Sequence, residues 1–125
     1  MDHAKNFLKV VNDAKSKIHE TNVVEVKRRL DAGEQFTLVD TREDSEWERG
    51  HIAGAIHIGR GVIERDIERL IPDAATPLVL YCGGGFRSAL AAESFQNMGY
   101  TDVLSMDGGW KAWNTAGYPT AVLSR

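Results

Sequence analysis

Cysteine and long apolar runs are scarce in this sequence. Its 125 residues include a single cysteine, Cys82, which has no partner for a disulfide within the chain, so nothing requires an oxidising compartment. The apolar run at residues 78–82 is far shorter than the ~20 residues that a membrane helix needs. Lysines interrupt residues 1–17, where a signal peptide would have an uninterrupted apolar core. We therefore expect a cytoplasmic protein without a membrane span.

Charge of one sign is not concentrated in any part of the chain. The 15 Lys and Arg residues are interspersed with 18 Asp and Glu residues, and the formal net charge is −3. Because nucleic acids and anionic membranes are bound by basic stripes or patches, we predict neither as a partner. The four histidines have no metal-ligand spacing. The sequence therefore predicts no metal site, and we expect no cofactor.

The chain length fits one domain with a sizeable core. Apolar residues at spacings of three and four predict helices, and short apolar or β-branched runs predict strands. Strands that alternate with helices favour an α/β fold, with a mainly parallel central sheet flanked by helices. The predicted helices cover residues 7–18, 23–30, 61–71, 88–98 and 110–115, and the predicted strands cover residues 36–40, 55–58, 78–81 and 102–106.

Three of the predicted strands end in side chains that can bind or react. Asp40 and Arg42 lie at the end of the first strand, His57 and Arg60 at the end of the second, and Cys82 with its glycines at the end of the third. In open parallel sheets, ligands bind outside the carboxyl ends of the strands. We therefore expect these three groups to contribute to one pocket.

The strand at residues 78–81 leads into the most specific motif of the sequence. Glycines allow close backbone approach, so consecutive N–H groups can converge on one point at a helix N-terminus. Such a nest, with an arginine beside it, favours the nucleophilic thiolate of a cysteine. An inert buried cysteine, or a phosphate-binding turn, is the alternative. We assign Cys82 as the catalytic nucleophile. The substrate-binding loop is assigned to the six residues that follow it, Gly83, Gly84, Gly85, Phe86, Arg87 and Ser88.

The spacing between Cys82 and Arg87 bears on the kind of substrate. Cysteine phosphatases separate these two residue types by five others, so that the loop encloses a phosphate and the guanidinium binds it through two hydrogen bonds. Here the arginine comes one residue earlier, and Ser88 takes the sixth position after the cysteine. We expect the shorter loop to favour a smaller group, such as the outer sulfur of a persulfide. An arsenate reductase or a phosphatase is the alternative.

The chain resembles the single-domain rhodaneses, which are sulfurtransferases. Cys82, Gly85 and Arg87 match the C-x-x-G-x-R active-site pattern of that family. Residues 1–20 lie outside the similarity and are predicted to form an accessory N-terminal helix on a rhodanese-like domain at residues 21–125. The other matching motifs are Val-Asp-Thr-Arg at 39–42, Gly-His-Ile-Ala-Gly-Ala at 50–55, Gly-Gly-Trp-Lys-Ala-Trp at 108–113 and Gly-Tyr-Pro at 117–119.

This resemblance implies transfer of sulfane sulfur in two steps. The Cys82 thiolate would take sulfur from a donor such as thiosulfate, and the resulting persulfide would pass it to cyanide or a thiol. A persulfide carrier that serves a protein partner, or a non-catalytic binding module, is the alternative. The start of the loop is also similar to mercaptopyruvate sulfurtransferases, from which Arg87 departs. Because the chain has no second cysteine, we expect the sulfur to leave to an external acceptor.

Residues near the other strand ends are assigned supporting roles. We expect Asp40 to accept hydrogen bonds from loop amides, and Arg42 to pair with a carboxylate such as Glu46. Arg60 is expected to project beside Cys82 and attract the sulfonate end of thiosulfate, with Glu64 orienting it. A solvated ion pair between those last two residues is the alternative.

Histidine and aromatic residues complete the predictions. His51 lies in the Gly-His-Ile-Ala-Gly motif and is expected to be a hydrogen-bonding turn residue. Trp110 and Trp113 are three residues apart on a predicted helix, which indicates packing against the sheet. Phe86 lies within the cysteine loop and is predicted to form either an apolar wall of the pocket or a docking patch for a protein partner.

Overall fold

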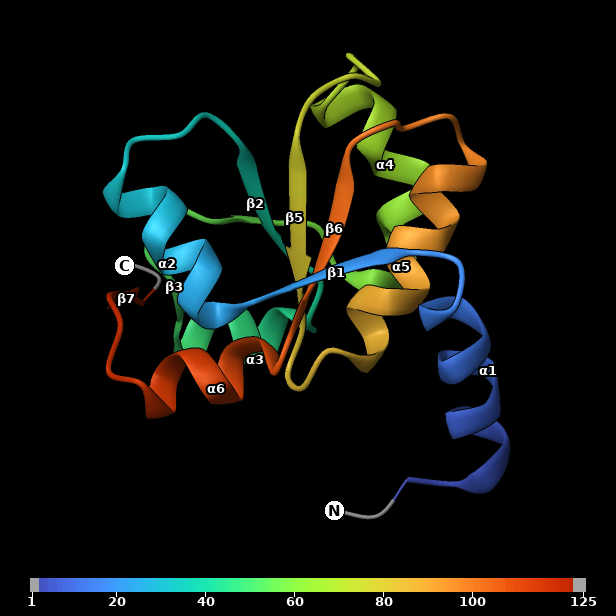
Figure 1. Ribbon diagram of the computed structural model, residues 1–125, viewed down its shortest axis with the longest axis horizontal. Coiled ribbons are helices and arrows are strands. Elements are labelled where there is room, and N and C mark those ends of the chain that lie inside the picture. The colour runs from blue at the N-terminus through green and yellow to red at the C-terminus, as the bar shows by residue number, and fades with distance from the viewer. Residues whose placement is uncertain (1–2, 123–125) are drawn as a thin grey trace.

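The computed structural model describes residues 3–122, in which strands and helices alternate along most of the chain (Figure 1). The helices are α1 (Lys5–Lys15), α2 (Val23–Asp31), α3 (Asp44–Arg49), α4 (Ile63–Leu70), α5 (Phe86–Asn97) and α6 (Gly109–Thr115), and a 3-10 turn, η1, spans Arg60–Val62. The strands are β1 (His19–Asn22), β2 (Thr37–Asp40), β3 (His51–Ile52), β4 (Ile56–His57), β5 (Leu78–Tyr81), β6 (Val103–Asp107) and β7 (Thr120–Ala121).

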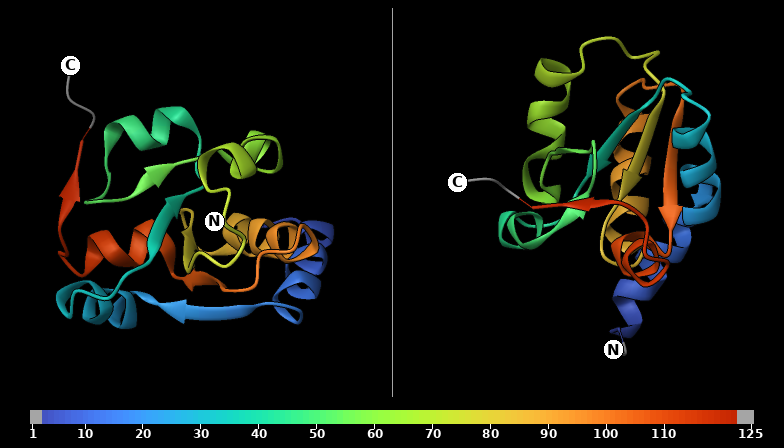
Figure 2. Two further views of the ribbon diagram at one scale, coloured as in Figure 1. Left: turned by 90° about the horizontal axis from the view of Figure 1, so that it is seen from above. Right: turned by 90° about the vertical axis from the view of Figure 1, so that its left-hand side faces the viewer.

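A five-stranded parallel sheet forms the centre of the molecule. Its strand order is β1-β6-β5-β2-β4, and every neighbouring pair is parallel. Strands β3 and β7 form a separate antiparallel pair. All four residues of β5 are buried, because helices cover both faces of the sheet (Figure 2). The predicted α/β fold with a mainly parallel central sheet is therefore confirmed.

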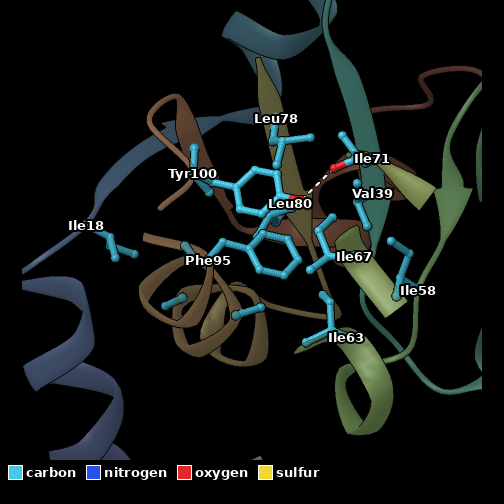
Figure 3. Close-up of a cluster of buried hydrophobic side chains, with 14 residues drawn as sticks. Ile18, Val39, Ile58, Ile63, Ile67, Ile71, Leu78, Leu80, Phe95 and Tyr100 are labelled. Carbon is cyan, nitrogen blue, oxygen red and sulfur yellow. Dashed lines mark hydrogen bonds between the residues drawn. The ribbon is translucent and has the colours of Figure 1, made fainter. Parts of the chain in front are cut away.

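Two apolar clusters, one on each face of the sheet, make up the core. We call them the α4–α5 cluster (Figure 3) and the α2–α6 cluster after the helices that cover them. Alternate side chains of β5 enter opposite clusters, as the period of a strand requires. The α4–α5 cluster contains Ile18, Val39, Ile58, Ile63, Ile67, Ile71, Leu78, Leu80, Ala89, Ala91, Ala92, Phe95, Tyr100 and Val103, and the α2–α6 cluster contains Val26, Leu38, Ile52, Val79, Tyr81, Met106 and Trp113.

The start of α2 agrees with the sequence prediction. Asn22 is the N-cap, and its side-chain oxygen accepts a hydrogen bond of 2.9 Å from the Glu25 N–H. Helix α3 was not predicted because the stretch is short and polar. It begins with a capping box in which the side chains of Glu43 and Glu46 each accept a hydrogen bond from the other's backbone N–H. This box fixes the position of Glu46, which matters for the site below.

The N-terminal segment differs from its prediction. Helix α1 ends at Lys15 rather than running through Ile18, and residues 19–22 form β1, an edge strand paired with β6. The sequence His-Glu-Thr-Asn has no apolar alternation, so only the tertiary pairing reveals the strand. Strands β3 and β7, of two residues each, carry too short a pattern to be recognised. Within residues 3–122, no helix is long and apolar enough to cross a membrane.

Candidate active site

Cys82 lies directly after the end of β5, at the carboxyl edge of the sheet. Its side chain is 1% exposed, so the thiol faces the start of α5 rather than bulk solvent. Gly85 precedes that helix with φ = +104°, a left-handed conformation that glycine adopts without strain. A Cβ at this position would also lie 3.3 Å from the Cα of Asp107. The glycine therefore allows the loop to turn sharply back over the cysteine.

Two backbone N–H groups of this turn donate hydrogen bonds to the sulfur. The N–H groups of Gly85 and Ser88 lie 3.2 Å and 3.3 Å from Cys82 Sγ. The Ser88 hydroxyl is 3.5 Å from the same sulfur and 2.9 Å from the hydroxyl of Ser105 on β6. Preorganised donors of this kind stabilise negative charge on the atom that they surround. The arrangement fits a thiolate nucleophile.

The N-terminus of α6 holds the outer side of the same loop. The Trp110 N–H donates to the Cys82 carbonyl at 2.8 Å, and the Lys111 N–H donates to the Gly83 carbonyl at 3.0 Å. In a trans peptide the N–H points away from the C=O, so the N–H groups of Gly83 and Gly84 point away from α6. Both of these glycines line the cavity at Cys82. Helix α6 thus fixes the direction of two backbone amides whose residues line the cavity.

Arg87 is held by Glu46 in a paired ionic contact. Its Nη1 and Nη2 lie 2.9 Å and 3.3 Å from the two carboxylate oxygens. Hydrogen bonding to Arg87 lowers the pKa of Glu46, and the Glu46 carboxylate in turn raises the pKa of the arginine. The prediction that Glu46 pairs with Arg42 is wrong. The capping box of α3 aims Glu46 at the cysteine loop instead.

Arg42 forms a buried ion pair with Asp40. Arg42 Nη2 is 2.8 Å from Asp40 Oδ2, and the two side chains are 3% and 0% exposed. Asp40 also accepts the backbone N–H of Arg42 at 2.8 Å, as the prediction for Asp40 as an acceptor of loop amides required. Arg42 donates further to the Gly50 carbonyl at 2.5 Å and lies over the ring of Trp110 at 4.8 Å. The pair therefore links the end of β2 to α3 and α6.

A cavity of about 630 Å³ opens at Cys82. Its wall includes three residues for which sequence analysis predicted no site role, His3, Phe7 and Lys111. Lys111 lies within the Gly-Gly-Trp-Lys motif, which could have drawn attention to it. No sequence signal connected the N-terminal residues to the cysteine. The full lining is His3, Phe7, Cys82, Gly83, Gly84, Phe86, Arg87 and Lys111.

The expectation of one pocket shared by three strand ends is wrong. Arg60 is not among the residues that line the cavity at Cys82, and its guanidinium pairs with Glu64 at 2.9 Å. His57 turns inward, with Nε2 2.7 Å from the Arg42 carbonyl. The main-chain N–H of Arg60 donates to the Thr41 carbonyl at 2.9 Å, so this segment is tied to the end of β2. Of the three strand ends, only the end of β5, with its cysteine loop, lines this cavity.

The predicted turn and packing roles agree with the structure. His51 Nδ1 is 2.9 Å from the Trp47 carbonyl, and the two rings are stacked with centroids 3.4 Å apart. Trp113 is 1% exposed in the α2–α6 cluster, and Trp110 packs at the edge of that cluster. Phe86 lines the cavity, which agrees with its prediction as an apolar wall. Among residues 3–122, no group of His, Cys, Asp and Glu side chains could hold a metal ion.

Comparison with protein families gives a match over most of the chain. A family model described as the rhodanese-like domain matches residues 22–116. The thiosulfate sulfurtransferase GlpE of Pseudomonas fluorescens is 36% identical over 87 residues, covering 70% of this chain and 77% of GlpE. YrkF of Bacillus subtilis is 30% identical over 98 residues, covering 78% of this chain. The chain spans about half of YrkF, 52% of its length.

Solved structures show the same architecture. The rhodanese-like domain of the Anabaena protein Alr3790 superposes with a TM-score of 0.78 at 26% identity, covering 83% of this chain and 79% of that domain. RPA3614 of Rhodopseudomonas palustris, a protein of unknown function described as a possible tyrosine phosphatase, gives a TM-score of 0.86 at 30% identity. That match covers 97% of this chain and 98% of RPA3614, so it includes the N-terminal helix.

Proposed function

The chain belongs to the rhodanese-like family, and from that premise we propose that it is a sulfurtransferase that carries sulfane sulfur as a persulfide on Cys82. The observation that carries this proposal is the placement of Cys82 Sγ against two backbone N–H donors, at 3.2 Å and 3.3 Å. Such donors stabilise a sulfur anion without a general base, so neither half of the reaction needs a histidine beside the cysteine.

In the first half-reaction, the Cys82 thiolate attacks the outer sulfur of a thiosulfate-type donor. A new S–S bond forms on Cys82, the S–S bond of the donor breaks, and the electron pair of the broken bond leaves with sulfite. The outer sulfur of the persulfide then carries the negative charge. It would lie among the remaining loop amides, where the N–H groups of Gly83 and Gly84 are directed away from α6.

In the second half-reaction, an external nucleophile takes the outer sulfur. Cyanide attacks that sulfur, thiocyanate forms, and the electron pair of the S–S bond returns to Cys82 as thiolate. A thiol acceptor, small or protein-bound, would take the sulfur in the same way. Because the chain has no second cysteine to compete for the sulfur, the transfer is intermolecular.

Mass spectrometry of the intact chain tests the proposal. After incubation with thiosulfate, we expect wild type to gain the mass of one sulfur atom, located on Cys82 by peptide mapping. Cyanide should then remove that sulfur and release thiocyanate. Wild type stripped with cyanide beforehand provides the sulfur-free reference. A chain that gains no sulfur, or a Cys82→Ser variant that still forms thiocyanate, would contradict the proposal.

The description of RPA3614 makes phosphoester hydrolysis the alternative to test. In this chain Glu46 occupies the two terminal nitrogens of Arg87, the group that a phosphatase loop uses to bind phosphate. We therefore expect negligible hydrolysis of an aryl phosphate by the same preparation that forms thiocyanate. Hydrolysis at a rate similar to that of sulfur transfer would favour the phosphatase.

A further inference from the structure

Aromatic side chains from the N-terminal segment pack onto the cysteine loop. The ring of His3 meets Phe86 edge to face, with centroids 4.6 Å apart, and the ring of Phe7 meets it in the same way at 6.2 Å. Lys15 Nζ lies over Phe86, 5.2 Å from the ring centroid. Phe86 is therefore held by α1, and together the three aromatic rings form one side of the cavity at Cys82.

Helix α1, which carries Phe7, is firmly packed against the rest of the domain. Helix α1 packs against α5, and Figure 1 shows its N-terminal end at the same end of the sheet as the loop between β5 and α5. Val11 and Ala14, on the inner face of α1, are fully buried. The family model begins at residue 22, so α1 adds to the cavity a surface that lies outside the matched domain.

Two basic side chains also line the cavity. Lys111, at the start of α6, is exposed and forms no ion pair with any residue in the part of the chain that the structure describes. Arg87 contributes a second cation, whose charge Glu46 partly balances. The lining of the cavity thus combines aromatic rings with two cations. A ligand that fits both must have an apolar body and an anionic head.

We propose that His3 and Phe7 are specificity-determining residues, which make the Cys82 cavity prefer organic thiosulfonates with an aromatic group over small inorganic donors. This inference rests on the proposed sulfurtransferase function. The anionic thiosulfonate head would face Lys111 and Cys82, while the aromatic group would lie against the wall of α1 and Phe86. A cavity of about 630 Å³ has ample room for both parts.

The chemistry of such a donor balances as it does for thiosulfate. The Cys82 thiolate attacks the outer sulfur of R–SO₂–S⁻, the persulfide forms, and the electron pair of the broken S–S bond leaves with the sulfinate R–SO₂⁻. Only the group R differs between donors, so a comparison of donors isolates its contact with the wall. Thiosulfate carries an oxide in place of R and gains nothing from aromatic side chains.

The test compares benzenethiosulfonate with methanethiosulfonate, with cyanide as the acceptor for both. We expect wild type to show a kcat/KM ratio of about tenfold in favour of the phenyl donor, since burial of a few apolar carbons gives discrimination of this order. Phe7→Ala and His3→Ala should each reduce that ratio severalfold, because they cost the phenyl donor more binding energy than the methyl donor. Phe7→Leu, which keeps an apolar side chain, should retain part of the preference.

Val10→Ala is the matched control, because Val10 lies on the same helix, is 56% exposed and does not line the cavity. Thermal unfolding of every variant shows whether α1 remains folded. A wild-type ratio near one, or a ratio that Phe7→Ala leaves unchanged, would overturn the inference while sulfur transfer itself stands. A Phe7→Ala variant that is equally slow with both donors would overturn it too, because that pattern indicates a general structural role.

Binding of the sulfinate products separates this inference from the proposed function. Calorimetric titration with benzenesulfinate and methanesulfinate requires no catalysis, and we expect wild type to bind the phenyl compound about tenfold more tightly. A preference that Phe7→Ala removes and Val10→Ala keeps supports the aromatic wall even if no sulfur is transferred. Equal affinity for the two sulfinates would overturn it, whatever the activity.

Discussion

Glu46 influences the cysteine loop through Arg87 and makes no contact with the sulfur itself. The carboxylate accepts two hydrogen bonds from the guanidinium and one, of 3.1 Å, from the backbone N–H of Glu43. The side chain of Arg87 is thereby held next to the loop at the start of α5. A residue of the short helix α3 thus positions the cation of a site that lies on another part of the sheet.

The Glu46–Arg87 pair predicts a specific dependence of stability on pH. The pair lowers the pKa of Glu46 in the folded chain, so it stabilises the fold at pH values above the unfolded-state pKa of about 4.3. That stability is lost as the pH falls and the carboxylate is protonated. Because the Glu46 side chain is 36% exposed, solvent screening keeps the effect below about 1 kcal/mol.

Urea unfolding of wild type and Glu46→Gln between about pH 6 and pH 3 checks this expectation. Wild type should lose more stability than Glu46→Gln across the range, because the amide does not titrate. Other carboxylates with lowered pKa values, such as Asp66, are present in both proteins and cancel in the difference. If the free energy of unfolding fell equally with pH in both proteins, the stabilising role of the Glu46–Arg87 pair would be contradicted.

At the scale of elements, the start of α6 lies so close to the backbone of the cysteine loop that no side chain would fit at Gly109. Gly109 adopts φ = +53°, and a Cβ at this position would lie 2.3 Å from the Cys82 carbonyl oxygen. Without a side chain there, the first turn of α6 can donate its amides to the loop. The same glycine therefore serves both the packing of α6 and the orientation of the loop amides.

We expect Gly109→Ala to destabilise the fold by about 2 to 4 kcal/mol, through overpacking against backbone atoms and a left-handed conformation. It should also weaken persulfide formation, because the loop must move. Gly84→Ala, in the cysteine loop that Gly109 contacts, is the matched control. A Cβ at Gly84 would meet nothing within 4 Å, and the φ of Gly84 is not left-handed. Chemical denaturation of both variants measures the difference, and equal stability would refute the close-approach argument.

At the scale of the whole molecule, the parts that could be predicted were those that a local pattern specifies. The strand β5 was predicted with its observed bounds, because a continuous apolar run is followed by Cys82 and glycines. The partner of Arg42 was predicted wrongly, because the choice between Asp40 and Glu46 depends on the direction of α3. The contribution of Phe7, on α1, to the wall of the cavity depends on the packing of α1 against α5. No spacing within residues 1–20 indicates that packing.

The two apolar clusters share the strand β5, which has consequences for how the molecule unfolds. Leu78 and Leu80 enter the α4–α5 cluster, whereas Val79 and Tyr81 enter the α2–α6 cluster. Loss of packing in one cluster therefore removes support from the central strand on which the other cluster packs. We therefore expect a single cooperative transition, as small domains usually show.

Phe95→Ala tests this coupling from one side of the sheet. Phe95 is fully buried in the α4–α5 cluster, so its truncation should cost about 3 to 5 kcal/mol. None of the three tryptophans belongs to that cluster. If the clusters unfold together, tryptophan fluorescence and far-ultraviolet circular dichroism should shift to the same lower denaturant midpoint in the variant. A fluorescence midpoint that stays at the wild-type value while the dichroism midpoint falls would show that the two faces of the sheet unfold independently.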